Sequence, residues 1–304
     1  MLSGSFCVLP EGPTKGLPLL RGVLHECDRI IRNYPDPSQV IISEASSPAN
    51  GFDPYSVHSS FYSLYANALL DIGIVIGKEP DFAIEGEPES IEDYLSAAFE
   101  ILQTSAVKYQ IADPNDWAHN YGWMKGLLLL ADIRGGKTLE PHRSASLEKQ
   151  SIMDFSAAEL VEKAQRHFET CSFLLSELQQ GNREDGAQLL EYPSFPAFVS
   201  IYAHLLLNVV DEVDSPEEQI KKAEEIGVIL DLATQRLKEI PTVERCLSVE
   251  SDIKRGKALI RRIQVEASIS LVDDEDLHNP LVITARADLE KCMSQMYEEP
   301  VDES

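Results

Sequence analysis

A helical spacing of apolar residues runs through almost the whole 304-residue chain, and this feature most limits the folds open to it. In the first such segment, Leu20, Cys27 and Ile31 are separated by one or two helical turns and share one face of a helix that ends near Asn33. Further segments of this kind lie near residues 61–76, 91–105, 117–128, 156–171, 196–213, 216–239, 246–268 and 281–296. Runs with the alternation of a β-strand are nearly absent. The sequence therefore predicts an all-α chain of about nine to ten helices.

Two of these segments carry a clear start signal. Ser156 is followed three residues later by Glu159, and Ser215 by Glu218, with Pro216 at the first helical position. A serine hydroxyl can accept a hydrogen bond from the backbone N–H three residues on, while the glutamate returns the bond. Helices are therefore predicted to begin just after Ser156 and Ser215.

Three segments carry the small–large–small pattern that the second helix of a tetratricopeptide-type pair uses to pack. Small residues let two helices approach closely, and the large residue fills the gap between pairs. The pattern also arises by chance in helices rich in Ala and Leu, and the spacing between the segments is irregular. The chain is therefore predicted to be an irregular tetratricopeptide-like α-solenoid. The segments are Ala98/Leu102/Ser105, Ala164/Phe168/Cys171 and Ala285/Leu289/Cys292.

The domain organisation expected from this pattern is simple. Residues 1–16 are expected to be a flexible N-terminal segment, and residues 17–297 a single helical-repeat domain. The last residues, 298–304, are mostly acidic and are expected to form a disordered, solvated tail.

Composition excludes several classes of function. The net charge is −25, from 51 acidic and 26 basic residues, and such a surface repels the phosphate backbone of nucleic acids. A charge-steered partner should therefore be basic. The five cysteines lack paired spacing, which favours a reducing compartment. No signal peptide or membrane-spanning run is present, so the chain is expected in the cytoplasm or nucleus.

One segment has the residues of a phosphate-binding loop. Gly136, Lys137 and Thr138 follow an apolar run, and residues 207–212 could supply the acidic strand that holds magnesium. Such a loop must open a helix, yet Pro141 follows within four residues of Lys137. The alternative is a glycine cap that ends the preceding helix. A nucleotide-dependent enzyme thus remains a minor alternative. No catalytic residue, metal site or cofactor is assigned.

Two clusters suit protein binding better. Residues 117–123 hold both tryptophans of the chain; Trp117 shares a helix face with Tyr121, whereas His119 and Trp123 lie on another. The second face is either an exposed anchor for a partner or part of a helix buried on both sides.

The other cluster is the dense basic group at residues 254–262, in which Lys254, Lys257 and Arg261 line one helical face. It could dock an acidic segment of a partner. Alternatively, it is a solvated face paired with the chain's own carboxylates.

Two segments, Leu20–Asn33 and Trp117–Gly126, resemble the fungal enhancer-of-translation-termination family. The resemblance implies an all-helical, tetratricopeptide-like protein without enzymatic activity. Members of this family include a regulator that binds the C-terminal degradation domain of an Ofd-type prolyl hydroxylase-like 2-oxoglutarate dioxygenase. Such a regulator assists nuclear import of the dioxygenase. Under low oxygen it inhibits the enzyme's promotion of the breakdown of a sterol-regulatory transcription factor.

The resemblance also implies a binding surface and a location. The polar positions of its first segment are expected to contact the partner, and the chain is expected mainly in the nucleus. A generic tetratricopeptide-type scaffold and a translation-termination factor remain alternatives. The expected contact residues of this segment are Arg21, His25, Glu26, Asp28, Arg29 and Arg32.

Overall fold

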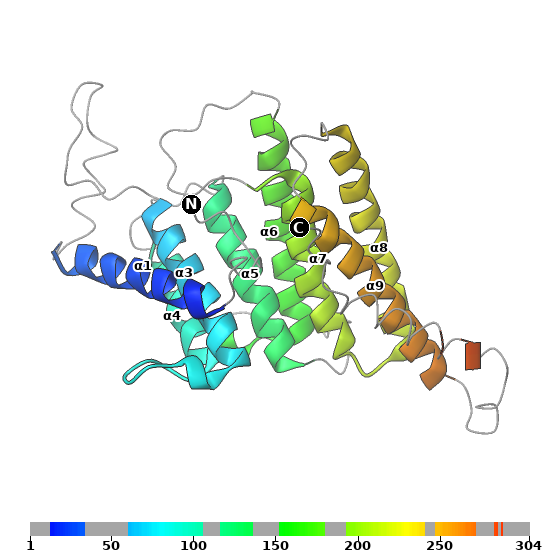
Figure 1. Cartoon of the computed structure of the whole chain (residues 1–304), viewed down its shortest axis with the longest axis horizontal. Helices are drawn as coiled ribbons and strands as arrows, with labels where there is room; N and C mark the ends of the chain where they lie inside the picture. Colours follow the sequence, from blue (N-terminus) through cyan, green and yellow to red (C-terminus); the bar gives the residue numbers. More distant parts are fainter. Residues whose placement is uncertain are drawn as a thin grey trace, which may run out of the picture. The chain divides into compact units, whose positions relative to one another are not determined.

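The computed structural model describes residues 13–33, 60–105, 116–135, 152–179, 193–240 and 247–271, with Ile283, Thr284 and Ala287. Within these ranges the chain forms eight α-helices, two short 3₁₀ helices and no β-strand (Figure 1). The all-α prediction is therefore confirmed. The α-helices are α1 (Pro13–Asn33), α3 (Ser60–Lys78), α4 (Ile91–Gln103), α5 (Trp117–Arg134), α6 (Ala157–Gln179), α7 (Phe195–Asp211), α8 (Pro216–Glu239) and α9 (Leu247–Ser270), and the 3₁₀ helices are η1 (Pro80–Phe82) and η3 (Ile152–Asp154).

The chain divides into two compact units. Met1–Leu130 and Lys163–Pro193 form the first, and Ala131–Glu162 and Ser194–Ser304 form the second. The domain boundaries expected from the sequence stay predictions. Helix α1 nevertheless begins at Pro13, a few residues before the expected end of the flexible segment. None of the helices within the described ranges is both long enough and apolar enough to cross a membrane.

The helix ends follow the expected chemistry. The hydroxyl of Ser156 accepts from the backbone N–H of Glu159, whose carboxylate accepts from the backbone N–H of Ser156 at 2.9 Å. The hydroxyl of Ser215 likewise accepts from the backbone N–H of Glu218 at 3.3 Å. Helix α5 ends at Arg134, and Gly135 follows with φ of +57°, a left-handed conformation that glycine adopts readily. Both predicted helix starts and the glycine cap are confirmed.

Helices α3 and α4 approach each other through glycines. A Cβ atom on Gly73 would lie 2.8 Å from Cβ of Tyr94, and one on Gly77 would lie 2.9 Å from Cβ of Ile91. Helix α3 ends at Lys78, so Gly77 lies in its last turn. Gly77 is therefore a packing residue, and its small size lets α4 lie close to α3.

Helix α5 is the central helix of the first unit and is buried on nearly all sides. A Cβ on Gly122 or Gly126 would meet the side chains of Leu102 and Phe99 of α4 at 3.3 and 2.9 Å. Lys125 is only 1% exposed, and its ammonium forms an ion pair with Asp71 of α3. A buried ammonium needs such a partner, so this pair fixes how α5 is rotated against α3.

The second unit contains a packed group of three helices, α7, α8 and α9. Gly256 of α9 lies close to Leu230 of α8 and to the ring of His204 of α7. A Cβ atom added to Gly256 would lie 2.8 Å from Cδ1 of Leu230. Arg262 of α9 forms an ion pair with Asp211 at the end of α7. The three helices are thus held together by close packing around Gly256 and by an ion pair about two turns further along α7.

The repeat signatures are partly visible. Ala98, Leu102 and Ser105 of the first are buried, as are Ala164 and Cys171 of the second. The third signature, Ala285/Leu289/Cys292, lies outside the described residues. The tetratricopeptide type of the repeat therefore stays a prediction.

The close approach of α3 to α4 predicts the effect of one methyl group. Gly73→Ala should lower the free energy of unfolding by about 1–3 kcal/mol, because Cβ of Tyr94 is next to the backbone and cannot move aside. The matched control is Gly22→Ala in α1, where nothing lies within 4 Å of the added Cβ. Gly22→Ala should leave the free energy of unfolding unchanged or raise it by up to about 1 kcal/mol. Urea unfolding measures both, and equal stabilities of the two variants would contradict the packing.

Candidate protein-binding surface

Helix α1 lies against α3 through its apolar face. Cys27 is 3% exposed and joins Phe61 and Tyr62 of α3 in one buried cluster. Burial raises the pKa of the Cys27 thiol to about 11, so the thiol stays protonated and behaves as a small apolar group. The half-buried side chains around this cluster are Val23, Ile30, Ile31, Tyr65 and Ile101.

The middle of α1 is held by a bidentate ion pair between Arg21 and Glu87. Nε and Nη2 of Arg21 donate to the two carboxylate oxygens of Glu87, each at 2.7 Å, and Nη2 also donates to the carbonyl of Phe82 at 2.6 Å. The guanidinium lowers the pKa of Glu87 and the carboxylate raises the pKa of Arg21. Two parallel charge-assisted bonds define an orientation as well as a distance. Arg21 therefore connects α1 to the segment between α3 and α4.

A second polar contact lies two turns further along α1. The hydroxyl of Tyr65 in α3 donates to Oδ1 of Asp28 at 2.6 Å. Burial, and then the bond to the Asp28 carboxylate, raise the pKa of this hydroxyl well above its ordinary value. Arg21 and Asp28 were both expected to contact a partner. The structure gives both of them partners within the chain, and their contact with another protein stays a prediction.

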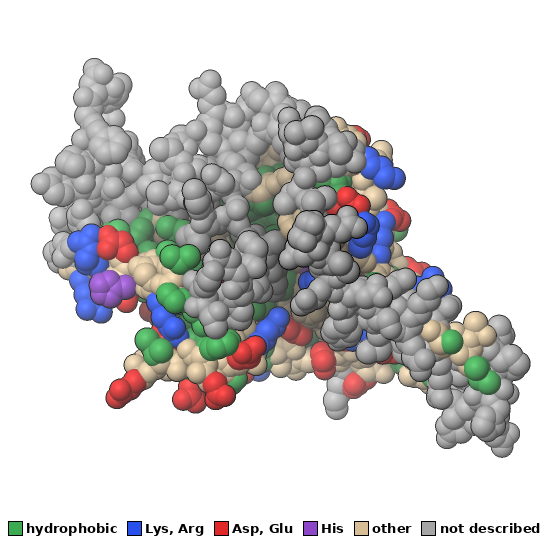
Figure 2. All heavy atoms as spheres, viewed as in Figure 1, with side chains coloured by type: hydrophobic (Ala, Val, Ile, Leu, Met, Phe, Trp, Pro, Cys, Tyr) green, Lys and Arg blue, Asp and Glu red, His purple; other side chains and the backbone are tan. Residues whose placement is uncertain are grey.

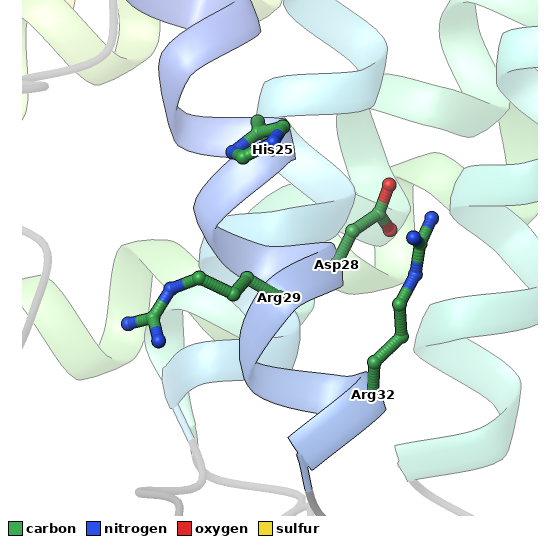
Figure 3. Close-up of a pocket in the computed structure, with 4 residues that line it drawn as sticks. All are labelled: His25, Asp28, Arg29 and Arg32. Atoms are coloured by element: carbon green, nitrogen blue, oxygen red, sulfur yellow. The ribbon is translucent and has the colours of Figure 1, made fainter.

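Four of the expected contact residues remain on the exposed side of α1: His25, Glu26, Arg29 and Arg32, here called the α1 face. Nε of Arg29 donates to Glu26 at 2.8 Å, and the pair is about half exposed. Figure 3 shows Arg32 reaching back along the helix toward Asp28, with Arg29 on the opposite side and His25 one turn away. The four residues labelled in Figure 3 line a shallow depression of about 180 Å³. Basic, acidic and histidine side chains are visible together over α1 in Figure 2.

The aromatic run of α5 is mostly core. Trp117 and His119 are 4% and 7% exposed, and the ring of Trp117 stacks on Tyr121 at 4.9 Å between centroids. Trp123 is half-buried and stacks on Phe99 at 5.3 Å. Of the two alternatives for this helix, burial on both sides is the one observed. Trp117 and His119 offer little surface to a partner, and binding through Trp123 stays a prediction.

A polar network lies beneath Trp123. Its Nε1 donates to Nε2 of His119 at 3.0 Å, so that nitrogen carries no proton. Its ring also stacks on His167, whose Nδ1 lies 2.8 Å from Oδ1 of Asn120. Nδ2 of Asn120 donates to the carbonyl of Asp116, which orients the amide oxygen toward His167. Burial is the main cause that lowers the pKa of both histidines to about 4. The neighbouring His167 lowers the pKa of His119 further, and Lys163 lowers that of His167. Both rings are therefore neutral in the folded chain at pH 7.

The basic cluster of α9 is largely paired with the chain's own carboxylates. Lys254 binds Glu250 at 2.8 Å, one turn earlier in the helix, and Lys257 binds Asp231 of α8 at 2.6 Å. Arg261 is exposed. This arrangement agrees with a solvated, paired face. Docking of a partner on Lys254, Lys257 and Arg261 stays a prediction.

The scaffold of a phosphate-binding loop is not found. Gly136, Lys137 and Thr138 lie outside the described residues, but the element before them is helix α5. The acidic strand that the alternative needs at residues 207–212 is instead the end of helix α7, where Asp211 pairs with Arg262. The mechanism needs a strand before the loop, so the nucleotide-binding alternative loses its main support. Within the described ranges, no three His, Cys, Asp or Glu residues lie close enough together to hold a metal ion.

Two comparisons relate the chain to known proteins. Residues 15–124 match the family model described as nuclear pore complex subunit Nro1. A curated protein named enhancer of translation termination 1, from Kluyveromyces lactis, is 31% identical over 91 residues. These residues are 30% of this chain and 18% of that relative, so the match spans less than a fifth of the relative's length. No solved structure matches the chain significantly.

These matches confirm the resemblance to the enhancer-of-translation-termination family. The segment Leu20–Asn33 lies inside the matched residues, and Trp117–Gly126 begins inside them. Both the α1 face and the elements that hold it, α3 and the segment with Glu87, therefore lie within the residues that the family model matches.

The neutral histidines predict a pH dependence of stability. Between pH 7 and pH 5 the unfolded chain takes up protons near the ordinary histidine pKa of about 6.5, whereas folded His119, with a pKa of about 4, does not. Stability should therefore fall as the pH falls, and each such histidine accounts for about 2 kcal/mol over this range. His119→Gln should remove about this part of the pH dependence in urea unfolding. A pH dependence equal to wild type in His119→Gln would contradict the assignment.

Proposed function

We propose that this chain is a nuclear regulatory protein that works by binding another protein. The premise is the match of residues 15–124 to the family model of nuclear pore complex subunit Nro1. The premise supports a regulatory role and nuclear association. The further identity of the partner rests on the resemblance of Leu20–Asn33 and Trp117–Gly126 to the enhancer-of-translation-termination family. The proposed partner is the C-terminal degradation domain of a prolyl hydroxylase-like 2-oxoglutarate dioxygenase.

The observation that carries the proposal is the α1 face. Its helix is fixed from behind by the Cys27 cluster, by Arg21 and by Asp28, so the side chains that point outward are presented in one arrangement. A preorganised surface loses less conformational entropy on binding than a mobile one. The face carries both signs of charge, with Arg29 beside Glu26, and thus suits a partner segment of mixed charge.

The proposed regulation is stoichiometric. The charged side chains of the α1 face support it, because they suit contact with another protein. Bound to the degradation domain, the chain would inhibit the dioxygenase's promotion of transcription-factor breakdown under low oxygen, and it would carry the dioxygenase into the nucleus. Both effects require only that one protein cover part of another.

The second candidate is a role in stop-codon recognition. The observation that favours it is the match to a protein named enhancer of translation termination 1. A stop-codon readthrough reporter separates the two roles. Deletion of the chain should leave readthrough unchanged if the dioxygenase role holds, and raised readthrough that the wild-type chain reverses would favour the translation role.

Charge reversal on the α1 face tests the proposed interaction. Arg29→Glu should weaken binding of the degradation domain about tenfold or more in a pulldown and in calorimetry, because arginines in the centre of interfaces often dominate affinity. Arg236→Glu in α8 is the matched control. Arg29 and Arg236 are similarly exposed, and each pairs with a glutamate three residues away. The control should bind like wild type.

Recovery of the dioxygenase is the first requirement of this test. If the wild-type chain recovers no dioxygenase at either high or low oxygen, the proposed partner is wrong. If Arg29→Glu and Arg236→Glu bind equally well, the partner stands but the α1 face is not its binding site.

A further inference from the structure

A groove of about 310 Å³ lies between α8 and α9 in the second unit. Its apolar floor contains Leu237 and Ile253, which are 6% and 3% exposed. Thr234 adds a side wall. The volume falls at the lower end of the range of about 300–1,000 Å³ that ligand pockets occupy. The groove is therefore large enough for one or two apolar side chains of a bound segment.

The rim of this groove is basic. Lys238 of α8 and Lys254 and Lys257 of α9 line it together with a single carboxylate, that of Glu250. The residues that line the groove include three lysines and one glutamate, and Asp231 beside Lys257 adds a second carboxylate. Lysine and arginine side chains are visible between acidic ones over α8 and α9 in Figure 2. Basic side chains thus outnumber acidic ones here, whereas in the whole chain 51 acidic residues outnumber 26 basic ones.

The counterions of two rim lysines are exchangeable. Glu250, which holds Lys254, is 43% exposed, and Asp231, which holds Lys257, is 75% exposed. Exposed ion pairs of this kind contribute little to stability, because water solvates both charges well. A carboxylate from another protein can therefore join or replace them without disturbing the fold. Apolar floor and basic rim together favour a ligand that has apolar side chains flanked by carboxylates.

We propose that the α8–α9 groove docks a short segment of a partner protein in which leucine-like side chains alternate with Asp or Glu. The apolar side chains would cover Leu237 and Ile253, and the carboxylates would meet Lys238, Lys254 and Lys257. The net charge of −25 disfavours an acidic segment on the molecule as a whole, which makes this groove a preferred place for it. This inference does not rest on the proposed dioxygenase, because α8 and α9 lie outside residues 15–124 and in the other unit.

The direct test uses fluorescence anisotropy with the full chain and a labelled twelve-residue peptide of alternating glutamate and leucine pairs. Saturable binding is expected, and it should weaken as the salt concentration rises. Two companion peptides, with serine for leucine and with lysine for glutamate, should each bind at least tenfold more weakly. Absence of saturable binding, or equal binding of the lysine companion, would overturn the proposal.

Variants locate the binding site. Lys254→Glu combined with Lys257→Glu should raise the Kd at least fivefold, whereas Lys221→Glu, an exposed lysine of α8 outside the groove, should change it less than twofold. Thr234→Trp, which fills the groove without changing its charge, should also abolish binding. Circular dichroism confirms that each variant is folded. If folded Thr234→Trp and the double variant both bind like wild type, the groove is not the site.

Discussion

The way α1 lies on α3 decides which of its side chains can meet another protein. A helix with one apolar face can slide or rotate against a flat apolar surface at little cost. Here the bidentate pair of Arg21 with Glu87 and the bond from Tyr65 to Asp28 select one rotation. The two contacts are separated by seven residues, about two helical turns, so they hold the helix at two points along one side. The α1 face is the surface that this rotation leaves exposed.

The two proposed binding surfaces differ in their charge. The α1 face in the first unit carries basic and acidic groups side by side, whereas the α8–α9 groove in the second unit is basic over an apolar floor. The whole chain is strongly acidic, so neither surface follows the average charge. A segment whose charges complement one of these surfaces does not complement the other equally well. Two surfaces of different chemistry on one chain are what an adaptor between two proteins requires.

Local signals predicted the helices well because each signal acts within one or two turns. The spacing of apolar residues, the reciprocal bonds of Ser156 and Glu159, and the left-handed Gly135 all concern neighbours in the sequence. These local signals do not predict contacts between residues that are far apart in the sequence. Gly77 resembles a helix stop, but its small size serves α4, whose Ile91 approaches it from outside the helix.

The sequence also could not show which polar side chains of the candidate surfaces are bound by residues of other helices. Arg21 and Asp28 are polar and lie on the outward side by spacing, yet Glu87 and Tyr65, more than 30 residues away, bind them. Lys125 resembles a surface lysine until Asp71 is placed beside it. The pair of Lys254 with Glu250 follows from helical spacing, whereas the pair of Lys257 with Asp231 requires the α8–α9 packing. That packing also creates the groove, for which no single segment carries a signal.

Hydrogen–deuterium exchange, measured on the chain alone and with the degradation domain of the dioxygenase, tests the central claim most directly. We expect slower exchange in peptides that cover residues 20–33 when the domain is bound, with no change in peptides from α8. Exchange in residues 20–33 that is the same with and without bound domain, together with protection of another helix, would contradict the claim that α1 presents the binding surface.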